Sequence, residues 1–386
     1  MNYEQKYLKY KQKYIQALTN QTGGAPQKII IDTDPGIDDA LAILLALGNP
    51  KVEVIALTTV FGNFPYVNIL TDNALKILNL VKIDIPVYEG ETKPLTVKRE
   101  DVDAYNADQM QKAQSMLVHG RDGLANLSED PSTRLEKGRL EKQPEHAADA
   151  IIRLATEYPG QIKLVTLGPL TNLALALKKD PSLKHKLHSV IIMGGSLFSP
   201  RGNAVNTPDA NLGNARPSAE ANFFKDPLAA QEVLRGGFEP SKLFLVPLDL
   251  TTQTDYIQFG LTKDPGSLPT LEPGIIRSFI VNSHDYYQNI YITKFLRKKV
   301  PFHDACAVFM AISPESFTNC EEVSINVETT GTFTAGMTII DNRKDAKPPI
   351  RDPNNITFYQ NINVFSLYQA IIASLNKLQR ELSLKP

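Results

Sequence analysis

Four aspartates lie within eight residues near the start of the chain, in the segment Asp32-Thr33-Asp34-Pro35-Gly36-Ile37-Asp38-Asp39. Carboxylates this close repel one another, and burying them together would raise their pKa values. A hard cation relieves the repulsion, and sites made only of oxygen ligands suit Ca²⁺ or Mg²⁺ better than Zn²⁺. The plainer interpretation is a helix N-cap at Asp38 with solvated acidic neighbours, because helix starts are rich in aspartate.

The elements on either side of the aspartates favour the metal interpretation. The run Ile29-Ile30-Ile31 predicts a strand that is buried on both faces, and Pro35-Gly36 ends it. Residues 40–47 are mostly alanine and leucine and predict a helix that ends at Gly48. Ligands of open α/β sheets bind at the carboxyl ends of strands. We therefore expect the aspartates at the mouth of a buried core.

The rest of the chain alternates between strand and helix patterns, which predicts an α/β fold with an open, mostly parallel sheet covered by helices on both faces. Residues 90–144 are polar and poorly periodic, and we expect a long excursion there. The expected strands are 52–60, 85–88, 161–167, 189–193 and 243–251, the expected helices are 65–80, 145–158, 274–296 and 364–382, and 323–327 with 332–340 are expected to form a small C-terminal β-hairpin.

The composition argues against several classes of protein, among them nucleic-acid-binding, disulfide-rich and membrane-spanning proteins. The net charge of -1 shows no overall basic bias, so nucleic acid is not an expected partner, and two cysteines indicate a reducing compartment without a disulfide framework. No apolar run is long enough to cross a membrane. Residues 1–24 form a Tyr/Lys-rich leader that ends at Gly23-Gly24, expected to be flexible or a short helix, and it lacks the apolar stretch of a secretory signal. We expect a cytoplasmic protein with one catalytic domain at 25–386.

The segment from Asp32 to Ala40 resembles the N-terminal signature of the inosine-uridine-preferring nucleoside hydrolases. Members of this family are Ca²⁺-dependent enzymes that cleave the N-glycosidic bond of ribonucleosides. The resemblance extends over about residues 27–380. It implies the Rossmann-like nucleoside hydrolase fold, a small-molecule ribonucleoside as substrate, and a homodimer or homotetramer. The leader resembles Tyr/Lys-rich leaders on proteins of giant DNA viruses, which implies a viral origin and a place in the host cytoplasm or virion.

The resemblance also implies roles for individual residues. Asp34 would act as the general base toward a calcium-activated water. His303 would be a catalytic acid that could protonate a purine, and His119, Tyr287 or Tyr291 could support either class of base. The implied calcium ligands are Asp34, Asp38, Asp39, the backbone carbonyl of Leu167, and Asp304. The implied substrate-binding residues are Asp38, Asn63, His119, Met193, Asn214, Glu220, Asn222, Tyr287 and Tyr291. Taken singly, each has a plain alternative: a loop asparagine forms turns, Asp304 could be an N-cap, and a tyrosine stripe packs in a core.

Two questions stay open at the level of sequence. The family usually carries Phe or Trp where this chain has Ala221, so the preference for purine or pyrimidine is undecided, and the loop 199–213 before it is longer than usual. The alternative functions are a catalytically silent or ligand-sensing viral protein that keeps the fold, and a metal-dependent phosphohydrolase. The phosphohydrolase needs a basic group near the metal, and no Lys or Arg lies at the expected strand ends.

Overall fold

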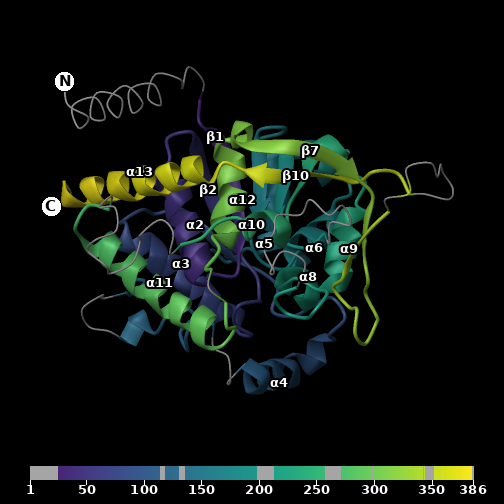
Figure 1. The fold of residues 1–386 in the computed structure, drawn as a ribbon, viewed down its shortest axis with the longest axis horizontal. Coiled ribbons are helices and arrows are strands. Elements are labelled where there is room, and N and C mark those ends of the chain that lie inside the picture. Colours follow the sequence, from purple (N-terminus) through teal and green to yellow (C-terminus); the bar gives the residue numbers. More distant parts are fainter. Residues whose placement is uncertain are drawn as a thin grey trace.

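An eight-stranded sheet with the order β3-β2-β1-β4-β5-β6-β10-β7 runs through the middle of the computed structural model (Figure 1). Every neighbouring pair is parallel except β10 and β7. The strands are β1 (Gln27–Thr33), β2 (Val52–Thr59), β3 (Val87–Glu89), β4 (Ile162–Thr166), β5 (Ser189–Met193), β6 (Leu243–Val246), β7 (Phe317–Val323) and β10 (Ile356–Ile362). The predicted open, mostly parallel sheet is confirmed.

The structure describes residues 25–113, 118–129, 135–197, 213–256, 271–297, 299–341, 343 and 352–384. The predictions for the leader 1–24 and for most of the loop 199–213 therefore lie outside the described residues.

Helices cover both faces of the sheet, and the isoleucines of β1 show why. Ile29 and Ile31 pack into one hydrophobic cluster and Ile30 into the other, all three fully buried, because successive side chains of a strand point to opposite faces. The first face carries α2 (Ile37–Gly48), α3 (Val67–Leu80), α11 (Ile275–Thr293), α12 (His303–Ile312) and α13 (Val364–Ser383). The second face carries α5 (Ala147–Glu157), α6 (Thr171–Lys179), α7 (Leu183–Lys186) and α9 (Pro227–Leu234).

The strand order reverses between β1 and β4. The chain moves outward from β1 through β2 to β3, and later outward in the other direction from β4 through β5 to β6. Such a switch point leaves a crevice at the carboxyl ends of its two central strands. The aspartate segment follows β1 and Leu167 follows β4, so the fold brings two predicted parts of the site to one crevice.

Two expectations about local structure were wrong. The predicted strand 243–251 ends at Val246, because Pro247 cannot donate to the sheet and instead precedes the short helix α10 (Leu248–Thr251). The excursion 90–144 contains the helix α4 (Val102–Ala113), which projects from the body of the molecule (Figure 1). Its residues favour helix by intrinsic propensity and lack a strong apolar stripe, so periodicity did not find it.

The C-terminal region contains the expected hairpin and final helix, but its sheet strands β7 and β10 were not expected. β8 (Ile325–Val327) and β9 (Thr338–Ile340) pair antiparallel as the predicted hairpin, and α13 occupies the predicted final helix. The remaining short helical turns are η1 (Arg99–Asp101), η2 (Leu127–Glu129), α8 (Ala221–Lys225), η3 (Pro240–Lys242) and η5 (Pro314–Ser316). Among the helices in the described ranges, none combines the length and apolarity that a membrane span requires.

Candidate active site and metal centre

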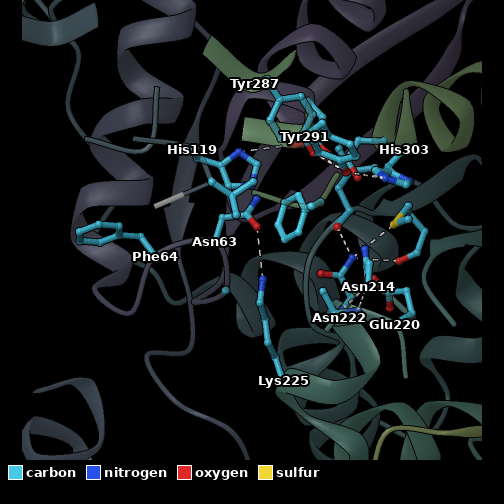
Figure 2. Close-up of a pocket in the computed structure, with 18 of the residues that line it drawn as sticks. Asn63, Phe64, His119, Asn214, Glu220, Asn222, Lys225, Tyr287, Tyr291 and His303 are labelled. Carbon is cyan, nitrogen blue, oxygen red and sulfur yellow. Dashed lines mark hydrogen bonds and ion pairs between the residues drawn. The ribbon is translucent and has the colours of Figure 1, made fainter. Parts of the chain in front are cut away.

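A cavity of about 240 Å³ lies at the carboxyl ends of the central strands. Figure 2 shows its lining, which comes from segments far apart in the sequence. The lining includes twelve of the predicted site residues: Asp38, Asn63, His119, Leu167, Met193, Asn214, Glu220, Asn222, Tyr287, Tyr291, His303 and Asp304. Asp34 and Asp39 are not part of the lining; both are buried beneath it.

Three carboxylates from two distant segments meet at this cavity. Asp38 and Asp39 lie in the first turn of α2 and Asp304 in the first turn of α12. One oxygen from each lies within 4.8 Å of the others. All three side chains are buried, and Oδ1 of Asp38 has no hydrogen-bond partner. A buried carboxylate oxygen without a partner is costly unless a cation satisfies it, so the donor set fits a hard divalent ion.

Asp34 lies beside this cluster but turns toward other groups. Its Oδ2 accepts a hydrogen bond from the backbone N–H of Asn63 at 2.6 Å, and the Lys225 ammonium lies 3.4 Å from the same oxygen. Its Oδ1 is buried and has no partner. A Cβ atom at Gly62 or Gly168 would overlap this carboxylate. Two glycines thus allow the backbone to approach Asp34 and hold it in place.

Burial raises the pKa of every carboxyl in the cluster. For Asp304 the rise is large, because the charges of Asp38, Asp39 and Asp34 add to the desolvation. For Asp34 it is also large, although Lys225 and the N–H of Asn63 oppose it. The carboxylates therefore repel one another in the metal-free protein, as expected from their spacing in the sequence.

Asn63 and Thr33 hold Asp39 in a fixed orientation. Oδ2 of Asp39 accepts from the backbone N–H of Gly36 and from the side-chain amide of Asn63, both at 2.9 Å, and Oδ1 accepts from the Thr33 hydroxyl. The helix N-cap is Gly36, so the N-cap interpretation of Asp38 was wrong. Similarly α12 has Phe302 as its N-cap, and Asp304 is not a cap.

The short helix α8 places three predicted sugar contacts in the cavity wall. The Asn222 amide donates to the Leu167 carbonyl at 2.6 Å and to the Met193 carbonyl at 3.2 Å. Glu220 caps the helix, and its carboxylate accepts from the backbone N–H groups of Asn222, Phe223 and Gly195. Asn214 accepts from the N–H of Ala221 at 2.8 Å. These bonds fix the side chains in position before any ligand arrives.

A chain of hydrogen bonds crosses the cavity from the carboxylates to His303. The Tyr287 hydroxyl donates to Oδ2 of Asp38 at 3.3 Å and lies 3.3 Å from the Tyr291 hydroxyl. The Tyr291 hydroxyl lies 3.1 Å from Nε2 of His303, whose Nδ1 is 2.8 Å from the Thr251 hydroxyl. Burial lowers the pKa of His303 to about 3, so its imidazole is neutral near pH 7.

His119 stacks on Tyr287, with ring centroids 5.4 Å apart and 29° between the ring planes. Its Nδ1 accepts from the backbone N–H of Ile37 at 3.1 Å. Burial lowers the pKa of His119 to about 4. The neutral ring that accepts at Nδ1 must carry its proton on Nε2, so His119 presents a single N–H donor.

Sequence reasoning missed two cations in the cavity wall, Lys225 and Arg297. Neither residue lies at a strand end, so the expectation that no Lys or Arg lies there did not exclude a basic group beside the aspartates. Lys225 is three residues after Asn222 in α8, and this spacing places both on one side of a helix, which is the signal that could have revealed it. Arg297 follows the end of α11, close to Tyr291, where the helix pattern gives no information about direction.

Comparison with known proteins shows which family this chain resembles. Residues 29–369 match the family described as inosine-uridine preferring nucleoside hydrolase. The chain is 36% identical over 321 residues to a probable uridine nucleosidase 2 of Arabidopsis thaliana, covering 83% of this chain and 87% of the relative. It is 36% identical over 325 residues to an inosine-uridine preferring nucleoside hydrolase of Leishmania major, covering 82% and 88%.

Solved structures of nucleoside hydrolases are also similar to this chain. A plant nucleoside hydrolase superposes with a TM-score of 0.73 at 28% identity, over 91% of this chain and 99% of that one. An inosine-guanosine nucleoside hydrolase superposes with a TM-score of 0.71 at 30% identity, over 90% and 98%.

Proposed function

The chain belongs to the inosine-uridine preferring nucleoside hydrolase family, a family of enzymes, and we propose that it performs Ca²⁺-dependent hydrolysis of the N-glycosidic bond of ribonucleosides, which releases free base and ribose. The observation that carries the proposal is that Asp38, Asp39 and Asp304 approach within 4.8 Å of one another at the cavity that Asn222 and Glu220 also line.

Asp34, Asp38, Asp39, Asp304 and the Leu167 carbonyl would hold the calcium ion. The partnerless oxygens of Asp34 and Asp38 support this assignment, since calcium accepts six to eight oxygen ligands. When bound, the ion supplies Lewis acidity that makes water more acidic and positive charge that orients sugar hydroxyls.

Asp34 is the proposed general base. A water oxygen attacks C1′ of the ribose, the bond from C1′ to the base nitrogen breaks, and the water proton passes to the carboxylate of Asp34. The raised pKa of Asp34 favours this role, because a carboxylate with a higher pKa is a stronger base than an ordinary aspartate. The buried carboxylates also favour the positive charge that develops on the ribose in the transition state.

Asn214, Glu220 and Asn222, together with Asp38 and Met193, are the proposed ribose contacts. Their hydrogen bonds to the backbone leave further acceptor capacity on each oxygen. The side chains are therefore preorganised, which reduces the entropy that binding must overcome.

The leaving base is bound and protonated at the aromatic end. His119 and Tyr287 offer stacked rings against which a flat base packs, and Nε2–H of His119 donates to it. His303, linked to Tyr291, is the proposed acid. Because its ring is neutral near pH 7, it takes up a proton from solvent as the bond to the base breaks and passes it to the departing nitrogen, and the proton held by Asp34 returns to solvent. The proposal covers ribonucleosides as a class, because Ala221 leaves the base end without the family's usual aromatic residue.

We further propose that the protein acts in the cytoplasm as a homodimer or homotetramer, as the family resemblance implies. Light scattering of the purified protein measures the assembly.

The decisive experiment incubates the purified protein and Ca²⁺ with purine and pyrimidine ribonucleosides and with their 5′-monophosphates. Free base, reducing sugar and inorganic phosphate are quantified separately. The proposal requires ribose and base in equal amounts. Phosphate without base would instead indicate a phosphohydrolase, and no product from any compound would indicate a silent or ligand-sensing protein.

A further inference from the structure

Lys225 is the cation that lies against the carboxylate cluster. Its Nζ is 3.4 Å from Oδ2 of Asp34 and 3.3 Å from Oδ1 of Asn63, and Figure 2 shows the side chain rising from α8 toward Asn63. The Lys225 side chain is 23% exposed and that of Asp34 is 1% exposed. This ion pair is therefore largely removed from water.

We propose that Lys225 is an internal counterion of the carboxylate cluster, which occupies in the metal-free protein part of the electrostatic role of calcium and weakens calcium binding by repulsion. The inference rests on the proposed calcium site and adds a residue that tunes its affinity.

The charges around the cluster support this assignment. The Lys225 charge opposes the rise in the pKa of Asp34, Asp38 and Glu220, which extends its influence beyond its direct partner. His119, the other basic group beside these aspartates, is neutral because burial lowers its pKa to about 4. Arg297 lines the same cavity, but its charge acts on Tyr291 and His303 at the aromatic end.

Lys225 also positions a neutral neighbour. Because its ammonium group contacts Oδ1 of Asn63, the Asn63 amide nitrogen faces the other way and donates to Oδ2 of Asp39 and to the Asp34 carbonyl. The lysine thus fixes both Asp34 directly and Asp39 through Asn63. Without metal, this arrangement holds two carboxylates in position that would otherwise move apart.

A divalent ion bound by Asp34 would add a repulsion from Lys225 to the attraction between Lys225 and the carboxylate. The ammonium group would then lie beside a ligand of the ion and repel the ion. A charge within about 4–6 Å typically shifts the proton equilibrium of a carboxyl group by about tenfold to a thousandfold, and we expect an effect on ion binding at the lower end of this range. Removing the lysine charge should therefore strengthen calcium binding, even though it removes a contact from the site. If Lys225 only held the site in position, its removal would weaken calcium binding.

The test measures the Ca²⁺ dissociation constant by calorimetry for the wild type and four variants of the full chain. Lys225→Met removes the charge, Lys225→Gln removes the charge but keeps a hydrogen-bond donor, and Lys225→Arg keeps the charge. Lys28→Met is the matched control: Lys28 is also 23% exposed and paired, with Glu53 at 2.6 Å, but it lies at the opposite end of β1.

We expect Lys225→Met and Lys225→Gln to bind Ca²⁺ about tenfold more tightly than the wild type, with Lys225→Arg and Lys28→Met unchanged. The rise in Tm on adding Ca²⁺ should be larger for the two neutral variants, because they start from a less stable metal-free state. Equal or weaker binding by both neutral variants, with a wild type that binds Ca²⁺, would overturn this inference alone. A wild type that binds no Ca²⁺ would overturn the inference and the proposed calcium site together.

Discussion

The side-chain amide of Asn222 donates a hydrogen bond to the backbone carbonyl of Leu167, with 2.6 Å between the nitrogen and the oxygen. A proposed ribose contact is thus joined directly to a proposed calcium ligand. A carbonyl oxygen has two lone pairs, so this bond leaves one for the ion. The two halves of the site, sugar and metal, are therefore held in a fixed relation by one side chain.

Replacing Asn222 by alanine should weaken both functions. Loss of a buried hydrogen bond costs about 1–3 kcal/mol, so we expect kcat/KM for ribonucleosides to fall about 10-fold to 100-fold. Steady-state kinetics with excess Ca²⁺ measure this effect. Asn326→Ala, a change in β8 away from the cavity, is the control and should keep wild-type kinetics; an equal loss in both variants would mean that the effect is not specific to the site.

Asp304→Asn should stabilise the metal-free protein and reduce the stabilisation that Ca²⁺ provides. Three neighbouring carboxylates raise the pKa of Asp304 after the larger effect of burial, so a neutral amide relieves repulsion. In EDTA we expect the melting temperature to rise by a few degrees, since about 1 kcal/mol corresponds to about 2–4 °C in a large domain. On adding Ca²⁺, the melting temperature of the variant should rise less than that of the wild type. A variant that is less stable in EDTA would show that Asp304 is not repelled there.

The metal-free protein should become less stable as the pH rises through the raised pKa values of its buried carboxyl groups. The pKa values of folded Asp34 and Asp304 are raised, so the native state binds more protons than the unfolded chain until the pH exceeds those values, and the free energy of unfolding falls. Buried His119, His284 and His303 have lowered pKa values. They destabilise the fold only below about 6.5, where the unfolded histidines take up protons.

Urea titrations in EDTA at several pH values measure how the free energy of unfolding depends on pH. Adding Ca²⁺ should abolish this dependence. Stability in EDTA that increases with pH above about 6.5 would contradict the raised carboxyl pKa values.

His303→Ala should slow the release of nucleobases far more than the release of a good leaving group. Loss of a general acid typically costs about 10²–10⁴-fold, whereas 4-nitrophenyl riboside needs no proton on its leaving group. We therefore expect a large loss of kcat with nucleosides and a small loss with the nitrophenyl riboside. The matched control is His284→Ala, because His284 is equally buried but lies outside the cavity lining. Equal losses on both substrates would remove His303 as the acid.

Much of the fold and the acidic segment of the candidate site could be predicted from local signals in the sequence, whereas the other residues of the cavity lining were expected only from the family resemblance. The isoleucine strand of β1 and the aspartates after it form one short segment, and its position at the end of a central strand follows from the α/β pattern. Side-chain direction is not local. Asp34 and Asp39 belong to the acidic segment, yet they lie beneath the cavity wall while Asp38 faces it.

The position of Lys225 also could not be predicted from its local sequence. It lies in a helix of five residues, and its approach to Asp34 depends on how α8 packs at the edge of the crevice. The helix α4 was missed for a different reason, since its residues form a helix without a strong apolar stripe facing the core. Tertiary packing, which no single segment encodes, decided the position of Lys225, whereas α4 forms by local propensity without the periodic pattern that reveals a helix.

The central claim is that a calcium ion and Asp34 together support hydrolysis of a ribonucleoside. The most direct test measures ribose release by protein stripped with EDTA, before and after Ca²⁺ is restored, for the wild type and for Asp34→Asn. The account predicts no turnover in the stripped protein, full recovery of the wild type on adding Ca²⁺, and at least about a 10²-fold lower rate for Asp34→Asn. Turnover that persists in EDTA, or full activity of Asp34→Asn, would contradict it.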